Sequence, residues 1–334
     1  MNQHITRAYN NFNLDRNRGI LFKTSKETRL RDEIEYYKAI SEIPSLSIYF
    51  PRYLDNLSKS KINTSEEYEL SLEYLAYDNL GNKMLFEDHD AYFWRNIISL
   101  LAFTLGEFRK YETNKDFERI AKDMYIEKTL KYYYDLKNNF AIFNDICSKD
   151  KIAINGKIYS NFEIIWPKIE NLIMRYIDTR KDSNLCVIHG DCCFSNILCG
   201  INPISKIQVI RFVDPRGSFG NVGIYGDPFY DIAKLRHSYE GGYEFIINDK
   251  FVLGYDKELN DKFWFSFKSP SNKILIEDLF KMAQFNLPET KLIEGLIFIG
   301  MCSRHYDSLD RQIVMYCTGI KILNEVIEEY EDMH

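Results

Sequence analysis

Short alternations of apolar and polar residues characterise the first 80 residues of the chain. The apolar run at residues 20–23 predicts a strand, and apolar side chains recur at helical spacing over residues 27–40. A further alternating run, residues 68–75, predicts another strand. Two strands flanking one amphipathic helix indicate a small, sheet-containing unit at the start of the chain.

The pattern changes to longer helical periods after residue 82. Its predicted helices cover residues 90–111, 117–140, 160–180, 231–239, 289–304 and 310–331. Aromatic residues are frequent in these helices, and they recur at the helical spacing that is typical of core positions. The acidic run at residues 328–332 fits a solvated helix end. Most of the chain after residue 82 is therefore expected to be helical.

One stretch interrupts the helices with three short strands. Residues 186–188 and 197–199 are apolar runs, and residues 207–213 alternate, with a hairpin signal at residues 200–203. The loop between the first two runs carries His189, Asp191 and Asn196, and the third run ends at Asp214. Four polar side chains thus fall at the ends of neighbouring strands.

This set of residue types suits phosphoryl transfer from ATP. Such a reaction needs a carboxylate that orients the attacking hydroxyl and takes up its proton, together with oxygen ligands for Mg²⁺. Asp191 is the candidate for the carboxylate, with Asn196 and Asp214 as the metal ligands. The competing interpretation of Asp191 is a turn residue that caps a backbone amide.

The motifs resemble those of the aminoglycoside phosphotransferase and choline kinase superfamily. The resemblance rests on His-Gly-Asp-x-x-x-x-Asn at residues 189–196, the strand-terminal Asp214, and Gly-Asp-Pro-Phe-Tyr-Asp-Ile-Ala at residues 226–233. It implies an α+β, protein-kinase-like bilobal fold. The nucleotide-binding lobe would cover residues 1–78, and the catalytic and acceptor-binding lobe residues 79–334. Residues 73–77 would join the two.

The resemblance also implies further roles in nucleotide binding. A strand lysine, matched by Lys23, would hold the α- and β-phosphates and pair with a helix glutamate, matched by Glu33, with Glu35 as the competing choice. No Gly-x-Gly-x-x-Gly loop is present to cover the phosphates. The polar turn at residues 10–13 could serve instead, or be an ordinary Asn-rich turn.

In the superfamily, the residues matched by His189 and Asp231 chiefly hold the catalytic loop, so neither is assigned chemistry here. Arg216 is an addition to the pattern. It could contact a phosphate or an anionic acceptor; it could equally form a structural ion pair with Asp227 or Glu240. Weaker candidates for acceptor contacts are His237, Glu240 and His305.

Several other functions are disfavoured. The cysteines at 186, 192, 193 and 199 lack the Cys-x-x-Cys spacing and convergence of a zinc site. A net charge of −6 argues against nucleic acid or an anionic membrane as partner. Gly190 replaces the arginine of His-Arg-Asp, and the short segment from Asp214 to Gly226 leaves no room for a protein-kinase activation loop.

The predicted function is ATP- and Mg²⁺-dependent phosphorylation of a hydroxyl on a small molecule. The acceptor is expected to be a sugar, a sugar derivative or an amino alcohol. The Asp-Pro-Arg-Gly and Gly-Asp-Pro-Phe-Tyr-Asp variants also resemble kinases linked to bacterial capsule or surface-polysaccharide synthesis. The alternatives are an aminoglycoside antibiotic phosphotransferase and a non-catalytic nucleotide-binding regulator. Seven cysteines and no apolar leader indicate a cytoplasmic protein without membrane insertion.

Overall fold

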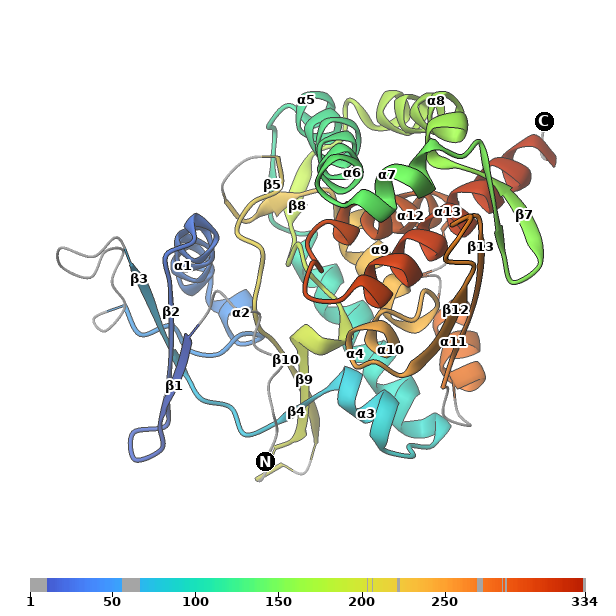
Figure 1. The fold of residues 1–334 in the computed structure, drawn as a ribbon. Coiled ribbons are helices and arrows are strands. Elements are labelled where there is room, and N and C mark those ends of the chain that lie inside the picture. Colours follow the sequence, from blue (N-terminus) through green and yellow to red (C-terminus); the bar gives the residue numbers. More distant parts are fainter. Residues whose placement is uncertain are drawn as a thin grey trace.

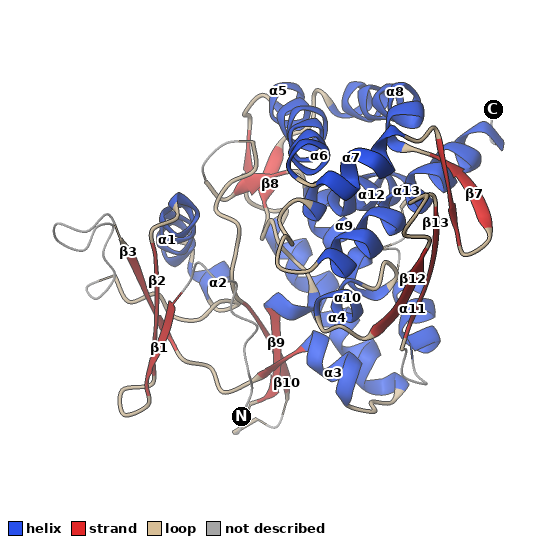
Figure 2. Cartoon of the chain, viewed as in Figure 1, coloured by secondary structure: helices blue, strands red, loops and turns tan. Residues whose placement is uncertain are grey.

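The computed structural model describes residues 11–55, 67–202, 204–205, 207–220, 223–268, 273–283, 285 and 287–332. A small three-stranded sheet with one helix lies to one side of a larger, mainly helical body, and short strands near the centre lie between them (Figures 1 and 2). None of the helices in these ranges is both long and apolar enough to cross a membrane.

The small sheet is antiparallel, in the order β1-β2-β3, with β1 (Asn11–Asp15), β2 (Ile20–Ser25) and β3 (Tyr68–Glu73). Helix α1 (Thr28–Ser41) buries one face, and α2 (Pro44–Ser47) follows it. The buried α1 side chains are Leu30, Glu33, Ile34, Tyr36, Tyr37 and Ile40. All but Glu33 belong to an apolar stripe at helical spacing, which explains why the sequence predicted this helix correctly.

The prediction of a polar turn at residues 10–13 is wrong for residues 11–13, the part of it that the structure describes. Residues 11–13 form part of β1, in which Phe12 pairs with Lys23 of β2. The sequence did not indicate β1 because asparagine is depleted in sheets. The residues of β1 are also exposed or half-buried rather than alternately buried. Asn10 lies outside the described residues.

The chain leaves β3 at Glu73 and next forms β4 (Asp78–Asn79), which pairs with β9 (Ile197–Ile201). The other neighbour of β9 is β10 (Gln208–Phe212), so two of the strands expected around the polar loop are adjacent. The first expected strand, β8 (Leu185–Val187), pairs instead with β5 (Glu112–Thr113) and β11 (Tyr225–Gly226).

The larger body contains the predicted long helices. They are α4 (Ala91–Phe108), α5 (Phe117–Lys122), α6 (Lys128–Asn139), α8 (Phe162–Arg180), α9 (Pro228–Tyr239), α12 (Pro288–Cys302) and α13 (Leu309–Asp332). A π-helical turn (Asp123–Glu127) divides the helix expected over residues 117–140. Helices absent from the prediction are α3 (Leu80–Phe86), α7 (Ala141–Ser148), α10 (Tyr243–Ile247) and α11 (Lys273–Met282).

A four-stranded sheet on the outer edge of the large body was also missed. Its order is β12-β13-β6-β7, with β6 (Lys151–Ile154), β7 (Lys157–Ser160), β12 (Phe251–Tyr255) and β13 (Lys262–Phe267). Strands β13 and β6 pair in parallel although more than 100 residues separate them. Such long-range pairing is invisible to local periodicity.

Gly217 marks a close contact between α1 and the segment that follows Asp214. Its φ of 68° is left-handed, and a Cβ added there would lie 2.1 Å from the carbonyl oxygen of Asp32. Gly156, in the turn between β6 and β7, is also left-handed at a φ of 86° but has open space around it.

We therefore expect Gly217→Ala to destabilise the protein more than Gly156→Ala. Both variants strain the backbone, but only Gly217→Ala forces a side chain against the α1 backbone. Overpacking of that kind costs about 1–3 kcal/mol. Urea unfolding of the two variants measures the difference in free energy of unfolding, and equal losses would contradict the close contact.

Candidate active site

A buried lysine connects the small sheet to the segment after β10. Lys23, on β2, places its Nζ 2.7 Å from Oε2 of Glu33 and 2.9 Å from Oδ1 of Asp214. The Lys23 and Glu33 side chains are almost fully buried, whereas that of Asp214 is 47% exposed. Because an unpaired buried charge is strongly unfavourable, these three groups depend on one another.

The three charges shift each other's protonation. Burial would lower the pKa of Lys23, but the carboxylates of Asp214 and Glu33 outweigh it and raise that pKa. Burial raises the pKa of Glu33 to about 7 in spite of the opposing charge of Lys23. The lysine is therefore held in its charged form.

Asp191 lies in the loop after β8 and is paired with two cations. Its Oδ1 is 2.8 Å from Nζ of Lys234 on α9, and its Oδ2 is 3.4 Å from Nη2 of Arg29 on α1. Burial opposes ionisation, but Lys234 and Arg29 hold the pKa of Asp191 well below its ordinary value. Asp191 is therefore a charged carboxylate at neutral pH.

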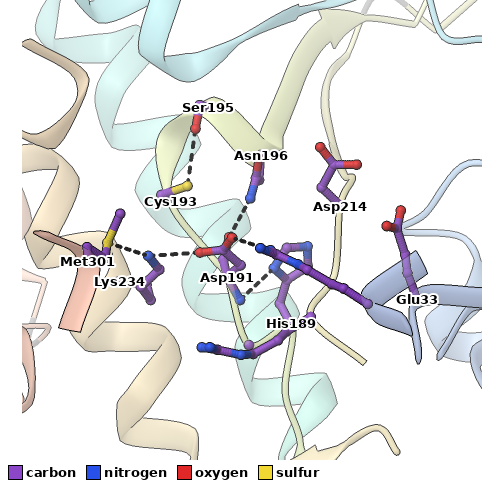
Figure 3. Close-up of polar contacts among 12 residues, drawn as sticks. Glu33, His189, Asp191, Cys193, Ser195, Asn196, Asp214, Lys234 and Met301 are labelled. Atoms are coloured by element: carbon purple, nitrogen blue, oxygen red, sulfur yellow. Dashed lines mark hydrogen bonds and ion pairs between the residues drawn. The ribbon is translucent and has the colours of Figure 1, made fainter. Parts of the chain in front are cut away.

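Asn196 is held beside Asp191 and Asp214 by the hairpin that follows the loop. Its side-chain Nδ2 donates to the backbone carbonyl of Asp191 at 2.9 Å. Its backbone carbonyl accepts from the amide of Val213 at 3.0 Å. Figure 3 shows the Asn196 side chain next to Asp191, with Asp214 to one side. Asp214 has a left-handed φ of 55°, a conformation in which Asp is enriched among non-glycine residues.

His189 and Asp231 fix the conformation of the loop. The buried His189 ring accepts from the Asp191 amide through Nδ1 at 3.2 Å, which leaves Nε2 to donate to the Val213 carbonyl at 3.0 Å. Burial lowers the pKa of His189 to about 4, so the ring is neutral. Asp231, on α9, accepts from the amides of His189 and Gly190 at 2.7 and 2.8 Å.

Solved structures with the same fold were found, although no family model and no curated protein matches the sequence. The GDP and kanamycin complex of APH(2")-IIia has a TM-score of 0.52 and 13% sequence identity, and the match covers 97% of this chain and 91% of that chain. A thermostable mutant of aminoglycoside phosphotransferase APH(4)-Ia has a TM-score of 0.53 and 8% identity, covering 92% of this chain and 87% of that chain. The chain has a kinase-like fold. At these identities the likeness concerns the fold alone.

This kinase-like fold brings the candidate residues of the sequence into one region. Lys23, Glu33 and Asp214 form one connected group, and Asp191 and Asn196 form another beside it. Glu35, the competing partner of Lys23, is exposed on α1.

Arg216 does not form either of the structural ion pairs that were considered for it. Its Nη1 donates to the Tyr230 hydroxyl at 2.6 Å, and its guanidinium lines a pocket next to Asp191. Asp227 accepts hydrogen bonds from Tyr125 and Tyr176, and Glu240 pairs with Arg236. Of the weaker candidates, His237 packs its ring at a tilt against Tyr243 and Phe298, and none of the three lines this pocket.

Two residues in contact with Asp191 were missed. Lys234 lies three positions after Asp231, so both face the loop that carries Asp191 from one side of α9. Arg29 lies four positions before Glu33 and shares its face of α1. Each lies one helical turn from a motif residue, and this spacing could have indicated both.

Asp231→Asn tests how the loop is supported. An asparagine keeps one acceptor oxygen, so one of the two buried amides loses its partner. We expect the free energy of unfolding to fall by about 1–3 kcal/mol. The exposed Asp182→Asn is the control and should change it by less than about 0.5 kcal/mol in urea unfolding. Equal effects would show that Asp231 does not brace the loop.

Proposed function

We propose that this protein transfers the γ-phosphate of ATP to a hydroxyl of a small molecule, with Mg²⁺ as cofactor. The observation that carries the proposal is the juxtaposition of Asp191 with Asn196 and with the Lys23–Glu33–Asp214 group. A positioned carboxylate, two oxygen ligands and a phosphate-binding cation are the parts that phosphoryl transfer requires.

The residues present fit Mg²⁺. Mg²⁺ prefers oxygen ligands and is usually held by one or two carboxylates together with substrate phosphates. The Asn196 amide oxygen and the second oxygen of the half-exposed Asp214 supply two such donors. When bound, the ion would neutralise charge on the phosphates.

The chain's own residues would orient the reactants. Lys23 would bind phosphate oxygens while Glu33 and Asp214 hold its ammonium in place. Asp191 would accept a hydrogen bond from the acceptor hydroxyl and take up its proton. The hydroxyl oxygen forms its bond to the γ-phosphorus as the bond to ADP breaks. Since the pKa of Asp191 is depressed, its main contribution would be orientation, and proton uptake would come late.

The acceptor is proposed to be a sugar, a sugar derivative or an amino alcohol. A link to surface-polysaccharide synthesis is supported only by the two motif variants at residues 214–217 and 226–231. The alternative of a non-catalytic regulator predicts nucleotide binding without turnover.

Phosphate transfer from γ-labelled ATP tests the proposal directly. The panel should hold neutral sugars, acidic and phosphorylated sugars, amino alcohols and aminoglycosides, each with Mg²⁺. We expect one class to be labelled and Asp191→Asn to lower kcat by about 10²–10⁴-fold, with Asp182→Asn unchanged. Bound Mg-ATP without labelling in any class would favour the regulator, and absence of Mg-ATP binding would overturn the kinase-like function.

A matched pair of glutamates tests the role of Lys23. Glu33→Gln removes a charged partner worth about 1.5–3 kcal/mol from the buried lysine, so the Kd for Mg-ATP should rise about 10-fold or more. Glu35→Gln changes an exposed residue on the same helix and should leave the Kd unchanged. Calorimetric titration measures both, and an equal Kd in the two variants would contradict the assignment.

A further inference from the structure

A pocket next to Asp191 is lined by an excess of positive charge. Its cationic lining residues are Arg29, Lys128, Arg216, Lys234 and Arg304. Asp191 is the one carboxylate among the described residues that line it. The cations come from α1, α6, the segment after Asp214, α9 and the turn after α12, so the fold itself assembles them.

Two of the five cations, Lys234 and Arg29, are paired with Asp191. Arg216 lies over the Tyr230 ring at 5.8 Å, and Arg304 lies over the Tyr132 ring at 5.7 Å. Lys128 directs its Nζ to the sulfur of Met124 at 3.7 Å. Within the described residues, no carboxylate lies within ion-pair distance of Lys128 or Arg216.

The electrostatics of Lys128 show how strongly cations crowd this pocket. Burial lowers its pKa well below the ordinary value, and the charges of Arg216, Arg304 and Arg29 lower it further. A bound anion would relieve both the repulsion and the cost of keeping Lys128 charged.

The pocket is separate from the nucleotide-binding group. Figure 3 shows Lys234 and Met301 on one side of Asp191, with Asp214 and Glu33 on the other. Met301 lines the pocket, and its carbonyl accepts from the amide of Arg304. The phosphates of ATP would lie by Lys23 and Asp214. They therefore do not account for Lys128 and Arg304.

Resting on the proposed function, we infer that the acceptor is an anionic alcohol, a small hydroxyl compound that carries a phosphate or carboxylate group. Lys128, Arg216 and Arg304 would bind the anionic group while the hydroxyl faces Asp191. The apolar wall of Ile293, Leu296 and Ile297 on α12 suits the less polar face of a sugar ring. An aminoglycoside or an amino alcohol such as choline carries positive charge and would be repelled, so the inference narrows the proposed acceptors to anionic sugars and sugar derivatives.

Binding of four glucose derivatives tests this inference, because they share a ring and differ in charge. Glucose 6-phosphate, glucuronate, glucose and glucosamine are titrated calorimetrically into the full chain, with and without Mg²⁺ and a non-hydrolysable ATP analogue. We expect at least one of the two anions to bind 10-fold or more tightly than glucose and glucosamine. The phosphate and carboxylate arms show which anionic group is preferred.

Variants on α6 assign the preference to this pocket. Lys128→Met removes a cation that lines it and should abolish the preference for the anion. Lys131→Met, one turn further along α6, removes an exposed cation and should preserve it. Lys128→Glu should additionally weaken binding of the anion below that of glucosamine, a reversal that a merely structural lysine would not produce.

The inference is overturned if the anions bind no more tightly than glucose, or if Lys128→Met and Lys131→Met behave alike. Failure of the proposed function has a different signature, namely no binding of the ATP analogue. The anion preference is measured without nucleotide as well, so the two results are independent.

Discussion

The shared position of Lys23 between Glu33 and Asp214 is the constraint on which the rest of the site depends. A buried ammonium needs its carboxylates, so β2, α1 and the segment after β10 must all be in place before the charge is compensated. The close approach of Gly217 to the backbone of Asp32 is a second contact between α1 and that segment. Packing and electrostatics thus fix one relative placement of the small sheet and the catalytic segments.

The loop that carries Asp191 is held by a second set of interactions. Asp231 binds two of its amides, and the His189 ring connects it to the segment at Val213. Lys234 keeps Asp191 charged from the same helix that carries Asp231. Helix α9 therefore supports the shape of the loop and supplies one of the two cations paired with its central carboxylate, which suits a reaction that depends on positioning and charge compensation.

The sequence was informative where local pattern and chemistry coincide. The apolar stripe of α1 predicted that helix, and the spacing of Asp191, Asn196 and Asp214 indicated residues that the structure brings together. The fold class came from the resemblance of the motifs to a known superfamily. β1 was missed because it is polar and exposed, and the outer sheet because its central pairing joins distant segments. The basic pocket could not be foreseen, since Lys128 and Arg304 lie in ordinary helical sequence and meet only through the packing of α6 against α12.

The parallel pairing of β6 with β13 has a consequence for the order of folding. Ala153 pairs with Lys262 and Ile154 with Phe263, so the chain between these strands forms one closed loop. This loop contains α8, the catalytic loop, Asp214 and α9. Closing such a long loop is entropically costly, and contacts of this range form late in folding. Asp191, Asp231 and Lys234 therefore lie within a segment whose two ends are joined only when this pairing forms.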